Sequence, residues 1–152
     1  MNDYVTNQSN QFEGKVIIVT GSTQGSGAET AKLFAARGAK AITICGRQEN
    51  KGIQIKKEIE ELGSKCLYVK ADLSKVEDCK KIVKLTDEKF GTIHSLVNVA
   101  GYTERGTVIS ATLENYENNF NVNARAPFIL IQETVKIMIR DKNKGTIANL
   151  LS

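Results

Sequence analysis

A glycine-rich, polar octapeptide, residues 20–27 with the sequence Thr-Gly-Ser-Thr-Gln-Gly-Ser-Gly, leaves this chain few choices of fold. It lies directly between an apolar run, Val16 to Val19, and a helical pattern that begins at Ala28. The order strand, tight turn, helix lets bare backbone approach a pyrophosphate, whose negative charge is favoured by the N–H groups and the positive end of the helix. We therefore expect a dinucleotide site that includes Gly21, Ser22, Thr23, Gln24, Gly25, Ser26 and Gly27.

Other readings of the octapeptide are weaker. A P-loop needs Gly-Lys followed by Ser or Thr, whereas Gly14 and Lys15 are followed by Val16, on the wrong side of the apolar run. No Gly-x-Ser-x-Gly nucleophile elbow is present. A purely structural turn stays open as an alternative, because glycine is the usual residue wherever a loop needs a positive φ.

Composition points to one ordinary globular domain. With 152 residues, 41% hydrophobic and 25% charged, the chain can build one core, which we assign to residues 12–152 after a polar leader at residues 1–11. A net charge of +4, on lysines without interleaved aromatic residues, argues against nucleic-acid binding. No signal-peptide pattern and no apolar run of membrane-spanning length occurs, so we expect a cytoplasmic protein with no membrane contact.

Metal chemistry is not expected. The three cysteines, Cys45, Cys66 and Cys79, are too widely spaced for a zinc site, and they are expected to be small core residues. The only histidine, His94, has no Cys, His or Glu at metal-ligand spacing and is expected to be structural.

Apolar, β-branched runs alternate with helical patterns along the chain. The runs predict buried parallel strands, and repeated strand–helix units with short loops predict an α/β fold with a doubly wound parallel sheet. Such a sheet binds its ligand at the carboxyl ends of the strands, where the strand order reverses. In the third helix, Ser74 and Glu77 have the spacing of a capping box. The predicted strands are Val16 to Val19, Ala41 to Ile44, Leu67 to Val69, Leu96 to Val99 and Thr146 to Leu151; the predicted helices are Gly27 to Arg37, Gln48 to Leu62, one from Ser74 to Phe90, Leu113 to Val122 and Pro127 to Arg140.

The end of the second predicted strand bears on cofactor choice. In a dinucleotide fold, a position about 20 residues beyond the glycine turn meets the adenosine ribose, and an acid there favours NAD over NADP. Here the strand ends in Cys45, Gly46 and Arg47, with no acid. A guanidinium suits bidentate phosphate contact, so NADP is the preferred cofactor and NAD remains possible. A solvated surface arginine is the alternative interpretation.

Several motifs together resemble the short-chain dehydrogenase/reductase family. The spacing of Gly21, Gly25 and Gly27 is similar to that family's T-G-x-x-x-G-x-G turn, although Ser26 and Gln24 differ from common members. Asp72-Leu73 resembles the pair that meets the adenine, with a simple turn as the alternative for Asp72; Asn98-Val99-Ala100-Gly101 resembles the loop under the cofactor, with Val99 in place of an asparagine. Asn123 and Ser152 match catalytic positions of the family, with Leu151 replacing a serine.

The resemblance implies a Rossmann fold and hydride transfer between a nicotinamide and a carbonyl or secondary alcohol. In the family, a Tyr-x-x-x-Lys pair supplies the proton, and here no lysine follows Tyr4, Tyr68, Tyr102 or Tyr116 at that spacing. We therefore expect the chain to be the N-terminal part of a longer reductase that acts on a small-molecule substrate. The full-length protein is expected to form a homo-oligomer, since residues 127–140 resemble the family's dimer-forming helix.

Two alternatives remain open from the sequence. The chain could be a catalytically inactive half-protein that binds a nucleotide or a partner, in which case its fifth strand would be an exposed edge. A methyltransferase of similar shape is disfavoured because Gly46-Arg47 supplies no acid at the tip of the second strand.

Overall fold

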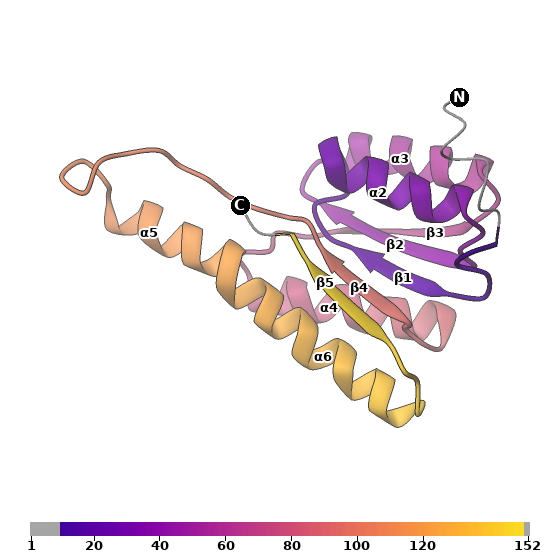
Figure 1. The fold of residues 1–152 in the computed structure, drawn as a ribbon. Helices are drawn as coiled ribbons and strands as arrows, with labels where there is room; N and C mark the ends of the chain where they lie inside the picture. Colours follow the sequence, from indigo (N-terminus) through magenta and orange to yellow (C-terminus); the bar gives the residue numbers. More distant parts are fainter. Residues whose placement is uncertain (1–9, 151–152) are drawn as a thin grey trace.

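The computed structural model describes residues 10–150 and has one five-stranded parallel sheet with the strand order β3-β2-β1-β4-β5 (Figure 1). The order reverses at β1, whose neighbours are β2 and β4. The predicted α/β doubly wound parallel sheet is therefore confirmed. The strands are β1 (Val16–Val19), β2 (Ala41–Gly46), β3 (Lys65–Lys70), β4 (Ser95–Asn98) and β5 (Thr146–Asn149).

Helices cover both faces of the sheet. Figure 1 shows α2 and α3 on one face and α4 and α6 on the other, while α5 extends beyond the sheet and runs on into α6. The helices are α2 (Gly25–Ala36), α3 (Glu49–Glu61), α4 (Val76–Phe90), α5 (Leu113–Phe120) and α6 (Ala126–Arg140), with one π-helical turn, η1 (Asn121–Arg125), between the last two.

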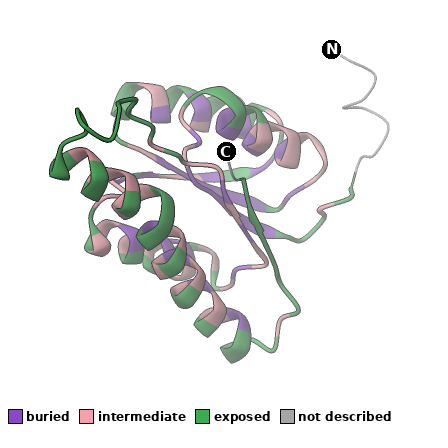
Figure 2. Cartoon of the chain, turned by 60° about the vertical axis from the view of Figure 1, so that its left-hand side comes forward, coloured by how far each residue is buried: buried purple, intermediate pink, exposed green. Residues whose placement is uncertain are grey.

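Each face of the sheet has its own apolar core. Successive side chains of β1 point to opposite faces, so they belong to the two cores in turn. Ile17 and Val19 pack with α2 and α3, whereas Ile18 packs with α4 and α6. All four residues of β1 are fully buried, as expected for a central parallel strand. Figure 2 shows that burial is concentrated on the strands and on the inner faces of the helices, while β5 is exposed along its length.

The topology places a ligand crevice beside β1. The helix that follows β1, α2, covers one face, whereas α6, which follows β4, lies on the other (Figure 1). The chain therefore leaves these two neighbouring strands toward opposite faces of the sheet. In open α/β sheets, ligands bind at the carboxyl ends of the strands at such a switch point.

The prediction of a capping box at the start of the third helix is wrong. The helix begins at Val76 with Lys75 as its N-cap, and no side chain caps it. The hydroxyl and the backbone N–H of Ser74 instead donate to Asp72 Oδ1, over 2.8 and 3.0 Å. Asp72, two residues before Ser74, thus forms an Asx-type turn and binds the hydroxyl that would otherwise cap the helix.

The other element boundaries lie within two residues of the expected ones. The second and third strands are longer than expected, and the fifth ends at Asn149, before the expected Leu151, which lies outside the described residues. Such shifts are usual, because helix and strand ends are set by caps and by neighbouring strands.

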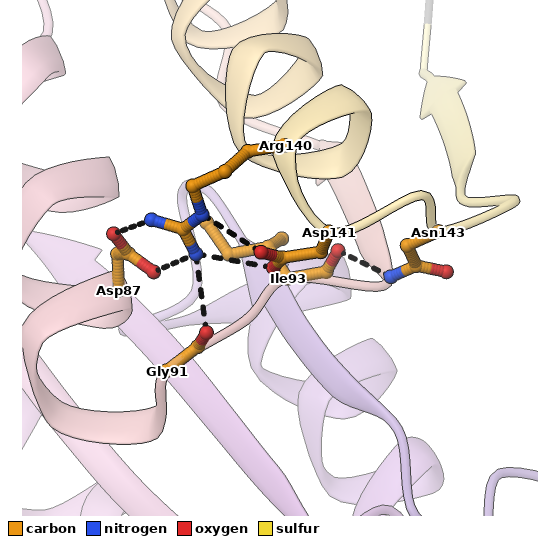
Figure 3. Close-up of polar contacts among 6 residues, drawn as sticks. All are labelled: Asp87, Gly91, Ile93, Arg140, Asp141 and Asn143. Carbon is orange, nitrogen blue, oxygen red and sulfur yellow. Dashed lines mark hydrogen bonds and ion pairs between the residues drawn. The ribbon is translucent and has the colours of Figure 1, made fainter.

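The C-terminal end of α6 is fastened to α4 by one arginine (Figure 3). Arg140 donates to both carboxylate oxygens of Asp87 over 2.7 and 2.8 Å, and also to Asp141 and to the carbonyl of Gly91. The pKa of Asp141 is lowered, chiefly by its hydrogen bond from Arg140. Asn143 continues the attachment by donating to the carbonyl of Ile93 over 2.9 Å. These contacts set where the chain turns from α6 into β5.

Among the described helices, none combines the length and the apolar character needed to cross a bilayer.

Candidate functional site

A cleft of about 360 Å³ opens at the carboxyl ends of β1, β2 and β4, and we call it the switch-point cleft. Its walls come from the glycine-rich turn, the tip of β2, the segment after β3 and the loop after β4. The lining residues are Gly21, Thr23, Gln24, Gly25, Ser26, Gly27, Cys45, Gly46, Arg47, Ala71, Asp72, Leu73, Val99, Ala100, Gly101, Tyr102 and Val122.

Backbone atoms pack closely around two glycines of the glycine-rich turn. A Cβ on Gly27 would lie 2.2 Å from the carbonyl oxygen of Gly21, and a Cβ on Gly21 would lie 2.7 Å from Cα of Ala100. Gly21 and Gly25 also have positive φ values of 62° and 57°. Glycine is therefore required at position 27 by close approach, at position 25 by backbone conformation and at position 21 by both.

Ser22 faces the interior and does not line the cleft. It is fully buried, and its hydroxyl donates to the carbonyl of Val19 and accepts from the N–H of Cys45 over 3.0 Å. Its own N–H donates to the carbonyl of Cys45 over 3.3 Å. Ser22 thus connects the end of β1 to the end of β2.

The tip of β2 is held by side chains from the glycine turn and from β3. A Cβ on Gly46 would lie 2.5 Å from the methyl of Thr23, so only glycine lets this turn lie against the strand. Tyr68 donates its hydroxyl to the carbonyl of Gly46 over 2.8 Å. The pKa of Tyr68 is raised, first by burial and then by Glu49, which keeps the hydroxyl protonated as a donor. The next residue, Arg47, is exposed and lines the cleft.

Asp72 lies in the cleft wall and also forms a turn. Its Oδ1 accepts two hydrogen bonds from Ser74, and its N–H donates to Asp78 Oδ2 over 2.8 Å. The pKa of Asp78 is lowered, chiefly by that bond from Asp72 and then by Lys81. Asp72 and Leu73 are therefore fixed beside the cleft by the beginning of α4.

A threonine fixes the loop after β4 under the glycine turn. The Oγ1 of Thr20 accepts from the N–H groups of both Val99 and Ala100 over 3.2 Å. Ala100 and Gly101 line the cleft, whereas Asn98 is buried beneath it and donates to Asn149 Oδ1 over 2.9 Å. Within residues 10–150, the buried Oδ1 of Asn98 has no hydrogen-bond partner.

Asn123 binds the backbone of Tyr102 in both directions. Its Oδ1 accepts from the N–H of Tyr102 over 2.8 Å, and its Nδ2 donates to the carbonyl of Tyr102 over 2.7 Å. Asn123 stands in η1, and π-helical turns are frequent at functional sites. The pair thus joins the loop after β4 to the junction of α5 and α6.

The structure brings most of the expected site residues to one place. The lining includes Arg47, the Asp72-Leu73 pair, Ala100-Gly101 and all of residues 21–27 except Ser22, while Asn98 and Asn123 support the walls. Ser152, expected to be catalytic, lies outside the described residues. The role of Tyr68 was missed from the sequence, because a tyrosine inside a buried strand resembles an ordinary strand residue. Thr20 belongs to the octapeptide, but the sequence did not show that its hydroxyl binds the loop after β4.

The cysteines are core residues, as expected. Burial raises the pKa of Cys45 and Cys66 to about 12 and that of Cys79 to about 11, and all three thiols are free. Although Cys45 lies at the cleft wall, its thiol is fully buried and protonated, so it is no nucleophile at neutral pH.

Comparison with known proteins agrees with the geometry of the cleft. The family model of the short chain dehydrogenases matches residues 15–152. An uncharacterized oxidoreductase of Thermotoga maritima is 35% identical over 141 residues, which cover 93% of this chain and 55% of that protein. The (+)-cis,trans-nepetalactol synthase NEPS1 of Nepeta racemosa is 31% identical over 139 residues, with 90% of this chain and 50% of that protein covered. The chain thus spans about half the length of these curated relatives.

Solved structures share the same fold. A short chain dehydrogenase of Burkholderia cenocepacia J2315, in complex with NADP, superimposes with a TM-score of 0.81 at 31% identity, covering 84% of this chain and 52% of that one. A metagenomic short-chain oxidoreductase in complex with NADP gives a TM-score of 0.86 at 27% identity, covering 93% and 63%. The sheet, the glycine turn, the cleft and the family match lead to one conclusion: the chain belongs to the short-chain dehydrogenase family, an oxidoreductase family, and corresponds to its N-terminal part.

Proposed function

We propose that the full-length protein is an NADP-dependent oxidoreductase that transfers hydride between the nicotinamide and a carbonyl or secondary alcohol of a small molecule. The observation that carries the proposal is the switch-point cleft, which the glycine-rich turn and an exposed arginine line together. Family membership supplies the reaction class.

The glycine turn fits a pyrophosphate. No heavy atom lies within 4 Å of the position that a Cβ on Gly25 would take, so the turn is open on its outer side. The first residues of α2 follow at once, and no acidic side chain occupies the first turn of that helix. Backbone N–H groups at a helix start without a competing carboxylate favour a bound phosphate.

Arg47 fits the 2′-phosphate that distinguishes NADP from NAD. It is exposed in the cleft wall at the tip of β2, and within residues 10–150 it forms no ion pair. An unpaired guanidinium can bind a phosphate without first breaking an internal salt bridge. Both solved relatives described above are complexes with NADP, which supports the same choice.

The nicotinamide end of the cleft would involve the loop after β4 and the C-terminal residues. When bound, the nicotinamide supplies hydride chemistry at its C4 carbon. Asn123 would hold the Tyr102 segment beside the substrate and order a water relay, and Ser152 would hydrogen-bond the substrate oxygen. The proton donor would come from a Tyr-x-x-x-Lys segment in the remainder of the full-length protein.

The cofactor choice is tested by exchanging Arg47 for aspartate. We expect Arg47→Asp in the full-length protein to weaken NADPH binding by about tenfold or more while NADH binding changes little, because the new carboxylate repels only a 2′-phosphate. Dissociation constants from fluorescence titration measure this. Equal losses for the two cofactors would contradict the phosphate contact.

The reaction class is tested at Ser152. We expect Ser152→Ala in the full-length protein to lower the turnover of carbonyl reduction by about 100-fold, with NADPH affinity retained. Steady-state assays over a panel of aldehydes and ketones measure this, and unchanged turnover would refute the assigned role.

A further inference from the structure

We propose that Lys51 is a second cation for the 2′-phosphate of NADP, held beside Arg47 by the side chain of Gln24. The inference rests on the proposed function and adds a residue that determines cofactor specificity. It starts from one contact: the ammonium of Lys51 donates to Gln24 Oε1 over 2.7 Å.

Gln24 brings this ammonium to the cleft. Gln24 and Arg47 both line the switch-point cleft, although they come from the glycine turn and from the tip of β2. Lys51 belongs to the first turn of α3, which begins at Glu49, two residues after Arg47. One amide therefore ties a cation of α3 to the phosphate-binding turn of the proposed site.

The charge of Lys51 is uncompensated. A glutamine oxygen is a neutral acceptor, and within residues 10–150 Lys51 makes no ion pair with a carboxylate. Glu49, the acid closest in sequence, pairs instead with Lys70 over 3.2 Å. Two free cations thus flank the tip of β2, and a phosphate dianion is the ligand whose charge matches them.

Packing fixes the helical turn that carries Lys51. A Cβ on Gly52 would lie 2.1 Å from the ring of Tyr68, so only glycine lets α3 approach β3 this closely. The hydroxyl of the same tyrosine donates to the carbonyl of Gly46, directly before Arg47. Tyr68 therefore places both cation-bearing segments, and less conformational entropy is lost when they bind one anion.

The test uses ligands that differ by one phosphate. Adenosine 2′,5′-bisphosphate and 5′-AMP report on the adenosine end of the site alone, without hydride transfer. For Lys51→Gln in the full-length protein, we expect the dissociation constant for the bisphosphate to rise roughly three- to tenfold, with that for 5′-AMP within about twofold of wild type. NADPH and NADH should follow the same pattern, and the NADPH difference should shrink as salt rises.

Matched variants separate this effect from a general change of charge. Lys57→Gln removes an exposed lysine of the same helix whose nearest carboxylate, Glu61, is 3.9 Å away, and it should leave both ligands unaffected. Lys51→Arg should keep most of the affinity for the bisphosphate. Gln24→Ala should weaken bisphosphate binding, and Lys51→Gln should cost less in that background than alone, because the two residues act as one unit.

The outcomes distinguish this inference from the function on which it rests. Loss of bisphosphate affinity in Arg47→Asp but not in Lys51→Gln would overturn the role of Lys51 and leave the NADP assignment standing. Equal binding of the bisphosphate and 5′-AMP to the wild type would overturn both. Equal loss of both ligands in Lys51→Gln, with a lowered melting temperature, would assign Lys51 a structural role and also overturn the inference.

Discussion

Single residues decide whether the turn after β1 can form. The backbone carbonyl of Gly21 lies so close to Gly27 that a methyl group on Gly27 would have no room. The clash would be with backbone atoms, which cannot rotate away as a flexible side chain could. The stability of the turn and its ability to bind a phosphate therefore depend on the same close packing of backbone atoms.

We expect Gly27→Ala to destabilise the protein by about 1–3 kcal/mol and to weaken nucleotide binding at least tenfold, because the turn must open to accept the Cβ. Urea unfolding and NADPH titration measure the two effects. Gly106→Ala is the control, since its nearest contact would be the hydroxyl of Ser110 at 3.3 Å and the residue is exposed. Wild-type stability in Gly27→Ala would show that the turn is looser than described.

Substitution of Ser22 tests whether this serine stabilises the fold or binds the nucleotide. We expect Ser22→Ala to cost about 1–3 kcal/mol, since it leaves the buried N–H of Cys45 without its acceptor, and to change nucleotide affinity of the folded protein by less than about twofold. Ser26→Ala, at an exposed position in the cleft, should leave the free energy of unfolding within about 0.5 kcal/mol. Thermal melts and NADPH titration of both variants check this. A large loss of affinity in Ser22→Ala would assign that serine to the ligand.

At the scale of elements, hydrogen bonds between segments position the walls of the cleft. Thr20 connects the end of β1 to the loop after β4, and Asn123 connects that loop to η1. The π-helical turn sits where α5 becomes α6, and there it points Asn123 at the backbone of Tyr102. Neither connection involves residues that are neighbours in sequence.

His94 fastens the opposite end of β1 in a pH-dependent way. The backbone N–H of Val16 donates to His94 Nδ1 over 3.1 Å, while the backbone N–H of His94 donates to the carbonyl of Val16 over 2.8 Å. The pKa of His94 is lowered, first by burial and then by Lys15 and Lys40. Its neutral form is therefore favoured in the folded state, and a protonated Nδ1 cannot accept the bond from Val16.

The sign of the effect follows from this lowered pKa. The unfolded chain binds a proton more readily than the folded protein, so the contribution of His94 is present above about pH 6.5, the ordinary value for histidine, and is lost as pH falls. We expect the urea midpoint to fall between pH 7.5 and 5, and to fall less in His94→Gln, whose side chain does not titrate. Identical pH dependence in the two proteins would refute the assignment.

Most elements were predictable from the sequence because their signals are local. The apolar run Val16–Val19 is a strand as expected, and the alternation of strands and helices is correct throughout. The capping box at Ser74 failed because a nearby carboxylate offered the hydroxyl a better partner, and a pattern of residue types does not rank two such partners.

For the whole molecule, the exposed position of β5 has consequences. β5 lies at the end of the strand order, and its four residues are exposed, as are the apolar side chains of Leu150 and Phe128. A strand edge without a neighbour can pair with another chain.

We expect the 152-residue chain expressed alone to be oligomeric or poorly soluble. Size-exclusion chromatography with light scattering measures the state, and a charged substitution at Ile147, such as Ile147→Lys, should reduce association by disfavouring edge pairing. A sharp monomer peak together with a cooperative melt of the unmodified chain would contradict this expectation.

The sequence by itself determined the local structure and its chemistry: the glycine turn between strand and helix, the alternation of elements, the arginine at the strand tip and the family they indicate. Only the tertiary structure decided the strand order and which distant side chains meet at the cleft. It turned Ser22 inward, placed Tyr68 between α3 and the tip of β2, and brought Lys51 to Gln24. The reason is physical: turns and periodic patterns depend on neighbours along the chain, whereas contacts across tens of residues exist only once the layers have packed.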